Sequence, residues 1–198
     1  MQSLLPFLLF AFVASITPGP TNILVMSHSS RRGLVATLPI IFGACVTAAL
    51  VVLAVGLGVG ETLLRFPRVQ QVMAWAGVLW LSWLAWQIFR SSAPSTDPEA
   101  AGDNGLGMVG AAGLQLINPK VWMMAVAMIS VFGASGDERA RILLLSLAFL
   151  LVCLPCMTAW ALLGVGSARF LTSPQAFTRM NALLALLLLA SAWLTVLV

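Results

Sequence analysis

The chain has few charged residues and no tyrosine. Of its 198 residues, ten are Lys or Arg and six are Asp or Glu, whereas 61% are apolar. Soluble domains carry charge on roughly a quarter of their residues, and a soluble fold of this length could not bury so much apolar surface. The scarcity of charge therefore excludes a soluble globular protein and predicts an all-α integral membrane protein.

Carboxylates are nearly absent from the apolar runs of the sequence. Glu61 lies at the end of one run, and the other acidic residues lie in polar segments. Paired-carboxylate catalysis is therefore not expected, and we predict that the protein is not an enzyme. Three cysteines and one distant histidine lack the spacing of zinc ligands, so neither a metal nor a cofactor is expected.

Six apolar runs are each long enough to cross a bilayer, which takes about 20 residues. They cover residues 4–26, 34–59, 69–89, 108–132, 140–165 and 180–198. The first run is not a cleavable signal peptide, because no basic region precedes it. We therefore predict a multi-pass membrane protein with the lipid bilayer as its surroundings. Most arginines flank these runs, so nucleic acid is not expected as a partner despite the pI of about 9.8.

The charges of the loops hardly determine the orientation. The first, third and fifth loops carry five arginines, and the second and fourth carry four. The positive-inside rule needs a clearer bias. We favour an orientation with both termini outside.

Prolines interrupt the first and the fourth run. "TPGP" occupies residues 17–20, and "NPK" occupies residues 118–120. A proline cannot donate a backbone hydrogen bond, and inside lipid the freed carbonyl has no water to bind. These prolines can simply kink two helices. Matched breaks in corresponding spans of two halves instead favour a transport site.

The two halves of the chain correspond at an offset of about 100 to 110 residues. A unit of three spans that is repeated once must have its second copy inverted, as in many secondary transporters. We therefore predict a single transmembrane transporter domain over residues 1–198. It consists of six transmembrane helices as two inverted three-helix repeats, over about 1–89 and 108–198, joined by a flexible loop over 90–107.

The breaks themselves predict the binding site. A broken helix presents free N–H groups at one new end and free carbonyls at the other, which complement the two charges of an amino acid. The asparagines beside the breaks could satisfy the freed backbone groups or bind the ligand. The candidate residues for substrate binding and transport are Thr17, Pro18, Gly19, Pro20, Asn22, Asn118, Pro119 and Lys120.

Lys120 is the only lysine of the chain, and it lies twelve residues into the fourth run. Burying a cation at the bilayer centre costs roughly 2.5–3.5 kcal/mol on insertion scales. A lysine near an interface avoids this cost by snorkelling, but Lys120 is too deep for that. We expect it to attract a substrate carboxylate or to exchange a proton during transport. If transport is proton-coupled, the proton must move on Lys120, on His28 or on the substrate, although His28 is more typical of a solvated helix end.

The cysteines leave an alternative function open. Cys153 and Cys156 form a C-x-x-C pattern, which would suit a membrane thiol-disulfide electron carrier. Such motifs react when they are exposed near a helix start, whereas this one is embedded in apolar sequence, where cysteine packs as a small residue. A pore subunit or a structural membrane protein is a third alternative. The small residues Gly56, Gly58 and Gly60 fit ordinary helix packing and could equally line a homodimer contact.

The sequence resembles the LysE/RhtB family of amino-acid exporters along essentially its whole length. The matching segments are "TPGPTN", "RRGLVATLPIIFGA", "WAGVLWLSWLAWQIF", "GLQLINPK" and "NALLALLLL". The resemblance implies six spans in the bacterial inner membrane and export from the cytoplasm, driven by the proton gradient. Thr21 and Asn22 after Pro20 resemble the branch for small neutral amino acids. The tryptophan-rich third span and "WALLGVGSARF" are most similar to exporters of cysteine and O-acetylserine, with threonine or homoserine as the other cargo of this branch. The third loop is acidic here, and the usual tyrosine of the third span is replaced by Trp80; both depart from the family.

Overall fold

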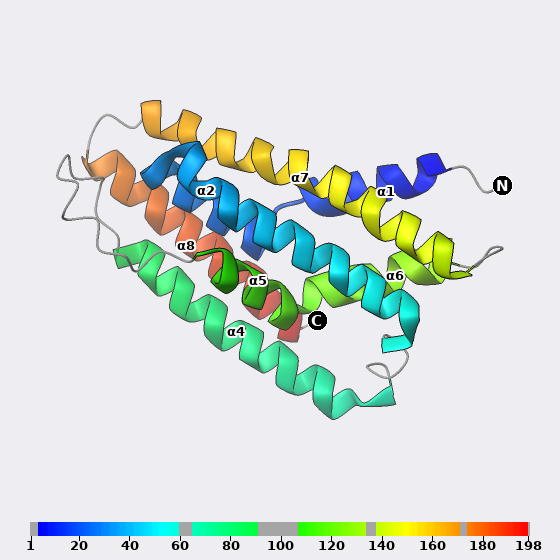
Figure 1. The fold of residues 1–198 in the computed structure, drawn as a ribbon. Helices are drawn as coiled ribbons and strands as arrows, with labels where there is room; N and C mark the ends of the chain where they lie inside the picture. The colour runs from blue at the N-terminus through cyan, green and yellow to red at the C-terminus, as the bar shows by residue number, and fades with distance from the viewer. Residues whose placement is uncertain (1–3, 60–64, 91–106, 134–137, 171–173, 198) are drawn as a thin grey trace.

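The fold is a bundle of helices (Figure 1). The computed structural model describes residues 4–59, 65–90, 107–133, 138–170 and 174–197. The elements in chain order are α1 (Leu4–Ile16), α2 (Pro20–Ala54), η1 (Val55–Val59), α4 (Pro67–Arg90), α5 (Met108–Ile117), α6 (Pro119–Phe132), α7 (Glu138–Phe170) and α8 (Pro174–Leu197). Here η1 is a short π-helical stretch. The predicted all-α class is confirmed for the described residues.

The chain reverses direction within α2, at Gly33. The sequence predicted a polar loop over residues 27–33, but most of these residues are helical. The hydroxyl of Ser30 donates to the carbonyl of Ser27, 2.8 Å away, so the polar side chains are satisfied within the helix. Gly33 has φ 79° and ψ 175°, a conformation that essentially only glycine adopts. Figure 1 shows the limb after this residue running back along the limb before it.

Several helices of the bundle have the length and composition of membrane spans. Pro20–Val59 and Arg139–Ser167 are each long and apolar enough to cross a bilayer. The pair α5 and α6, which is bent by 65°, makes a third if it is one span. Leu4–Ile16 and Thr178–Ala190 are shorter apolar helices. The chain is therefore an α-helical membrane protein, while the count of six spans and their inverted repeat stay a prediction.

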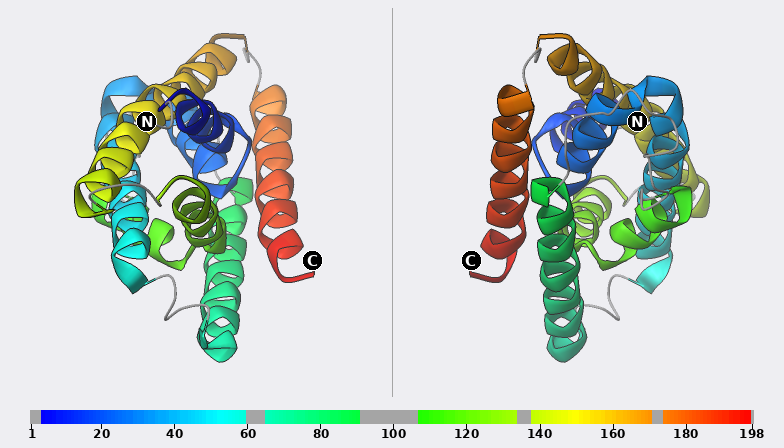
Figure 2. Two further views of the ribbon diagram at one scale, coloured as in Figure 1. Left: turned by 90° about the vertical axis from the view of Figure 1, so that its right-hand side faces the viewer. Right: turned by 90° about the vertical axis from the view of Figure 1, so that its left-hand side faces the viewer.

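Two apolar clusters hold the helices together. The larger cluster joins residues of α1, α2, α5, α6 and α7, and the smaller one joins α2, α4, α5 and α8. Figure 2 shows the same division: α4 and α8 lie side by side on one flank, away from α1 and α7. The helix α5 carries Ala111 in one cluster and Leu114 in the other. Its position between the clusters places the second break at the centre of the bundle.

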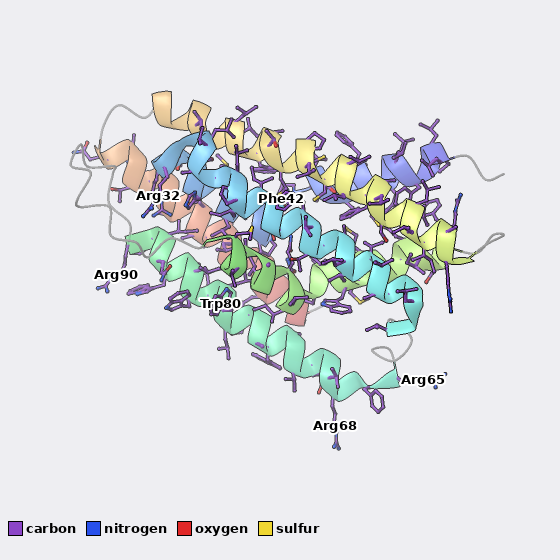
Figure 3. All side chains as sticks on the ribbon, in the orientation of Figure 1. Arg32, Phe42, Arg65, Arg68, Trp80 and Arg90 are labelled. Carbon is purple, nitrogen blue, oxygen red and sulfur yellow. The ribbon has the colours of Figure 1, made fainter. Side chains whose placement is uncertain are left out.

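The labelled arginines lie at the two ends of the bundle. Figure 3 shows Arg32 and Arg90 at one end, and Arg65 and Arg68 at the opposite end. Apolar side chains such as Phe42 lie between them. This is the arrangement expected of charges that flank membrane spans. The loop expected over residues 90–107 lies outside the described residues, apart from its first and last residue.

Candidate functional site

The first helix break separates α1 from α2. Gly19 is extended (φ −160°, ψ 174°), and Pro20 begins the next helix. The side-chain amide of Asn22 donates to the carbonyl of Ser15 at 2.9 Å and to that of Thr17 at 3.3 Å. Asn22 thus satisfies carbonyls that the break removes from the helical pattern.

The second break separates α5 from α6. Asn118 has a non-helical conformation (φ −81°, ψ 107°), and Pro119 begins the next helix. The side-chain oxygen of Asn118 accepts a hydrogen bond of 3.1 Å from the backbone N–H of Lys120. This is the usual N-cap interaction. Both asparagines therefore satisfy freed backbone groups, which was one of the two roles predicted for them.

Two tryptophans bind further carbonyls at the breaks. The indole N–H of Trp160, on α7, donates to the carbonyl of Ile16 at 3.1 Å. The indole N–H of Trp122, on α6, donates to the carbonyl of Leu116 at 2.8 Å. The same kind of donor thus binds a carbonyl at the end of each broken helix. The sequence analysis did not identify these two tryptophans. Their only signal in the sequence is the indole N–H, which needs a hydrogen-bond acceptor when it lies in an apolar region.

Lys120 connects the two breaks. Its ammonium nitrogen, Nζ, donates to the carbonyl of Thr17, 3.2 Å away. A Cβ atom added to Gly19 would lie only 2.8 Å from this nitrogen. The lysine therefore lies against the first break and its ammonium bonds there.

A second polar connection runs through Gln115, which sequence analysis did not single out. The hydroxyl of Thr21 donates to the side-chain oxygen of Gln115 at 3.1 Å. The side-chain nitrogen of Gln115 donates to the carbonyl of Ala44 at 3.3 Å. Gln115 is only 2% exposed. It thus joins α5 to both limbs of α2, and an amide in a predicted span was the signal for it.

Both breaks line one cavity. Its walls come from α1, α2, α5, α6 and α7 and consist of Ala14, Ser15, Gly19, Pro20, Thr21, Asn22, Ala48, Gln115, Asn118, Lys120, Val121, Met124, Phe149, Cys153 and Met157. The space open to a water-sized sphere is about 30 Å³, and one water needs roughly 10–15 Å³ by this measure. The cavity therefore has room for about two or three waters in this conformation.

The eight predicted site residues divide into two groups. Five line the cavity: Gly19, Pro20, Asn22, Asn118 and Lys120. Thr17 contributes its carbonyl as the partner of the lysine. Pro18 and Pro119 are not on the cavity wall.

The electrostatic character of the cavity is set by one cation and one helix end. None of the described residues that line the cavity is a carboxylate. Gly19, which precedes α2, makes no side-chain cap hydrogen bond, whereas Asn118 caps α6. Because Pro20 has no N–H, Thr21 and Asn22 carry the first N–H groups of α2. The cavity can thus bind an anionic group between the start of α2 and the lysine.

The cysteines are free and buried. Cys153 lines the cavity, and its thiol contacts that of Cys45 on α2. Cys156 does not line the cavity. His28 also lies away from it, and its Nδ1 shares a hydrogen bond of 3.0 Å with the hydroxyl of Thr37. Within the described residues no group of three or more metal-ligating side chains comes together.

Discontinuous helices that meet around a cavity with a few polar side chains in an apolar bundle are typical of membrane transporters. The sequence model of the LysE type translocator family matches residues 12–197. The chain belongs to this family and is a multi-pass protein of the bacterial inner membrane.

Relatives with known names support the same assignment. A protein of Klebsiella pneumoniae named "Cysteine/O-acetylserine efflux protein" is 29% identical over 164 residues, which are 80% of each chain. A protein of the same name in Escherichia coli O157:H7 is 26% identical over 94% of this chain and 93% of its own. An "Uncharacterized membrane protein" of Vibrio cholerae is 27% identical over 90% of this chain and 89% of its own. No solved structure matches the chain.

Proposed function

We propose that the protein is a secondary transporter that exports small neutral amino acids from the cytoplasm, driven by the proton gradient. The observation that carries the proposal is the cavity shared by the two helix breaks, with Lys120 of one break bonded to Thr17 of the other. The names of the relatives in Klebsiella pneumoniae and Escherichia coli favour cysteine and O-acetylserine as cargo. Threonine or homoserine fits the same cavity chemistry.

The cavity would bind the carboxylate of the amino acid at the start of α2. The positive end of this helix lacks a side-chain cap, and an anion there is stabilised by the helix dipole and free N–H groups. The ammonium of Lys120 supplies a full positive charge on the same wall. In this binding mode, the lysine exchanges the carbonyl of Thr17 for the carboxylate of the cargo.

The size of the cavity implies that it must widen during transport. Room for about two or three waters is too little for an amino acid, which has at least five heavy atoms. Rocking of two inverted three-span repeats, residues 1–89 and 108–198, would widen it toward one side of the membrane at a time. Labelled arginines at opposite ends of the bundle support several crossings. The proposed orientation places both termini outside the cytoplasm, as expected from the sequence.

Few groups of the protein are suited to carry the proton during transport. None of the described residues that line the cavity is a carboxylate, so Lys120 or the amino acid itself is the carrier in this proposal. His28 lies away from the cavity and bonds Thr37, which makes it the less suitable group.

The experiment compares amino-acid export from cells that produce the wild type, Lys120→Ala or Lys120→Arg. We expect Lys120→Ala to abolish export, and Lys120→Arg, which keeps the charge, to retain part of it. Arg179→Ala, an exposed cation on α8, is the control for loss of one positive charge and should export normally. Tagged protein in the membrane fraction confirms equal amounts. Undiminished export by Lys120→Ala would remove the lysine from the mechanism, and a wild type that exports no small neutral amino acid would overturn the proposed function.

The alternative of a thiol-disulfide electron carrier has a separate test. Such a carrier needs both Cys153 and Cys156, whereas an exporter needs neither as a redox group. Cys156→Ser is the sharper variant, because Cys156 lies outside the cavity wall. Normal amino-acid export by this variant supports the transporter, and loss of function with normal folding supports the electron carrier.

A further inference from the structure

One side of the cavity carries a hydroxyl group that the binding mode described above does not use. Ser15 lies one turn before the first break and is 5% exposed. It lines the cavity together with Phe149, Cys153 and Met157, which recur every four residues and so share one face of α7. This part of the wall combines small, sulfur-containing and aromatic groups with one hydroxyl.

The hydroxyl of Ser15 has no hydrogen-bond partner among the described residues. Other hydroxyls in these helices donate to a carbonyl of the preceding turn: Ser146 to Ile142 at 2.9 Å, and Thr158 to Leu154 at 2.8 Å. Ser15 departs from this pattern. Its polar neighbour is the thiol of Cys153, which is only a weak acceptor.

The other polar side chains of the cavity are already bonded within the protein. Thr21 bonds Gln115, which in turn bonds a carbonyl, and Asn22 bonds two carbonyls. Lys120 and Asn118 bond backbone groups of the breaks. A buried hydroxyl without a partner costs free energy. Ser15 is therefore the lining side chain whose hydroxyl is left for a ligand.

We propose that the hydroxyl of Ser15 binds a polar atom in the side chain of the transported amino acid. This inference rests on the proposed function and narrows its cargo to short side chains that carry a hydroxyl, thiol or ester oxygen. The thiol of Cys153 and the sulfur of Met157 give the rest of this wall a soft, weakly polar character that suits a sulfur or ester group.

The test is a change of selectivity. Export of serine and cysteine is compared with that of 2-aminobutyrate, in which a methyl group replaces the hydroxyl or thiol. For Ser15→Ala we expect the preference for the polar cargo to fall about fivefold. This corresponds to about 1 kcal/mol for one net hydrogen bond, at tenfold per 1.4 kcal/mol. Ser146→Ala is the control, because it removes a buried hydroxyl away from the cavity, and it should leave the preference unchanged.

Thermal unfolding separates this role from a structural one. Because the Ser15 hydroxyl makes no hydrogen bond to a described residue, Ser15→Ala should unfold at the wild-type temperature or slightly above it. An unchanged preference in Ser15→Ala overturns the inference and leaves the proposed function intact. A wild type that exports none of the three amino acids overturns the proposed function itself.

Discussion

Gly77→Ala tests how closely α4 packs against the second break. A Cβ atom at residue 77 would lie 2.7 Å from the carbonyl oxygen of Ile117 and 3.5 Å from Cδ of Pro119. The first distance is several tenths of an ångström shorter than ordinary van der Waals contact, and its partner is backbone, which cannot rotate away. The helix must therefore move, and overpacking of this kind costs about 1–3 kcal/mol.

The control for this variant is Gly113→Ala, on α5. An added Cβ there meets nothing within 4 Å. Replacing a helical glycine by alanine also changes helix propensity, by about 0.8–1 kcal/mol in water. Because both glycines lie inside helices, this gain is shared and cancels in the comparison. The difference between the two variants therefore isolates the contact of Gly77 with Ile117.

The assay is thermal unfolding of both purified variants in the same detergent and at the same scan rate. For a chain of about this size, 1 kcal/mol shifts Tm by roughly 2–4 °C. We expect Gly77→Ala to unfold roughly 2–12 °C below Gly113→Ala. Equal unfolding temperatures would mean that α4 does not approach the carbonyl of Ile117, and the packing described around the second break would be wrong.

Three further substitutions address the turn, the first break and the lysine. Gly33→Ala should destabilise the protein by about 1–3 kcal/mol, because φ is 79° there and nothing lies near the added methyl; a Tm equal to that of Gly113→Ala would contradict this. Asn22→Asp keeps the shape but loses the amide donor for two carbonyls, so we expect a loss of about 1–3 kcal/mol in unfolding measurements, and an unchanged Tm would refute it. The extended backbone at residue 19 accepts an alanine, and the added methyl of Gly19→Ala displaces only the end of the Lys120 side chain. We expect a wild-type Tm with reduced export. Wild-type export would rule out a role for the position of the Lys120 ammonium.

The positions of the two helix breaks could be predicted because proline lacks a backbone N–H and fixes its own φ angle. Pro20 and Pro119 each begin a helix, as a residue without an N–H does most easily. The asparagines could also be anticipated, since freed backbone groups inside lipid need partners. In both cases the cause lies within a few residues of the sequence.

The contacts across the cavity were not predictable in the same way. Thr21 and Gln115 are 94 residues apart in sequence, and Trp160 and Ile16 are 144 apart. Which faces of these helices meet depends on how each helix is rotated. Helices with apolar residues all round carry little sequence signal for that rotation.

The prediction for the segment just before Gly33 was wrong, because a loop was expected there and the segment is helical. Serines and arginines before this glycine suggested a loop, because these residues are polar and follow an apolar run. Their side chains instead bond the backbone of their own helix: Arg31 donates to the carbonyl of Ser27 at 3.2 Å, and Ser29 donates to that of Met26 at 3.0 Å. Only the glycine has the positive φ that ends the helical path.

In the binding mode that we propose, the placement of Lys120 suits a dipolar cargo. Lys120 is half-buried, and a cation in such surroundings is normally paired with a carboxylate. Its partner here is the carbonyl of Thr17, and none of the described residues that line the cavity is a carboxylate. A carbonyl carries only a partial charge, so a positive charge remains on this wall of the cavity. In this proposed mode the carboxylate of the amino acid would supply the missing negative charge, and the ammonium of the same molecule would bind the carbonyl of Thr17 that the lysine leaves. Such an exchange of partners would let one lysine serve both states, because neither charge of the cargo would be left unpaired.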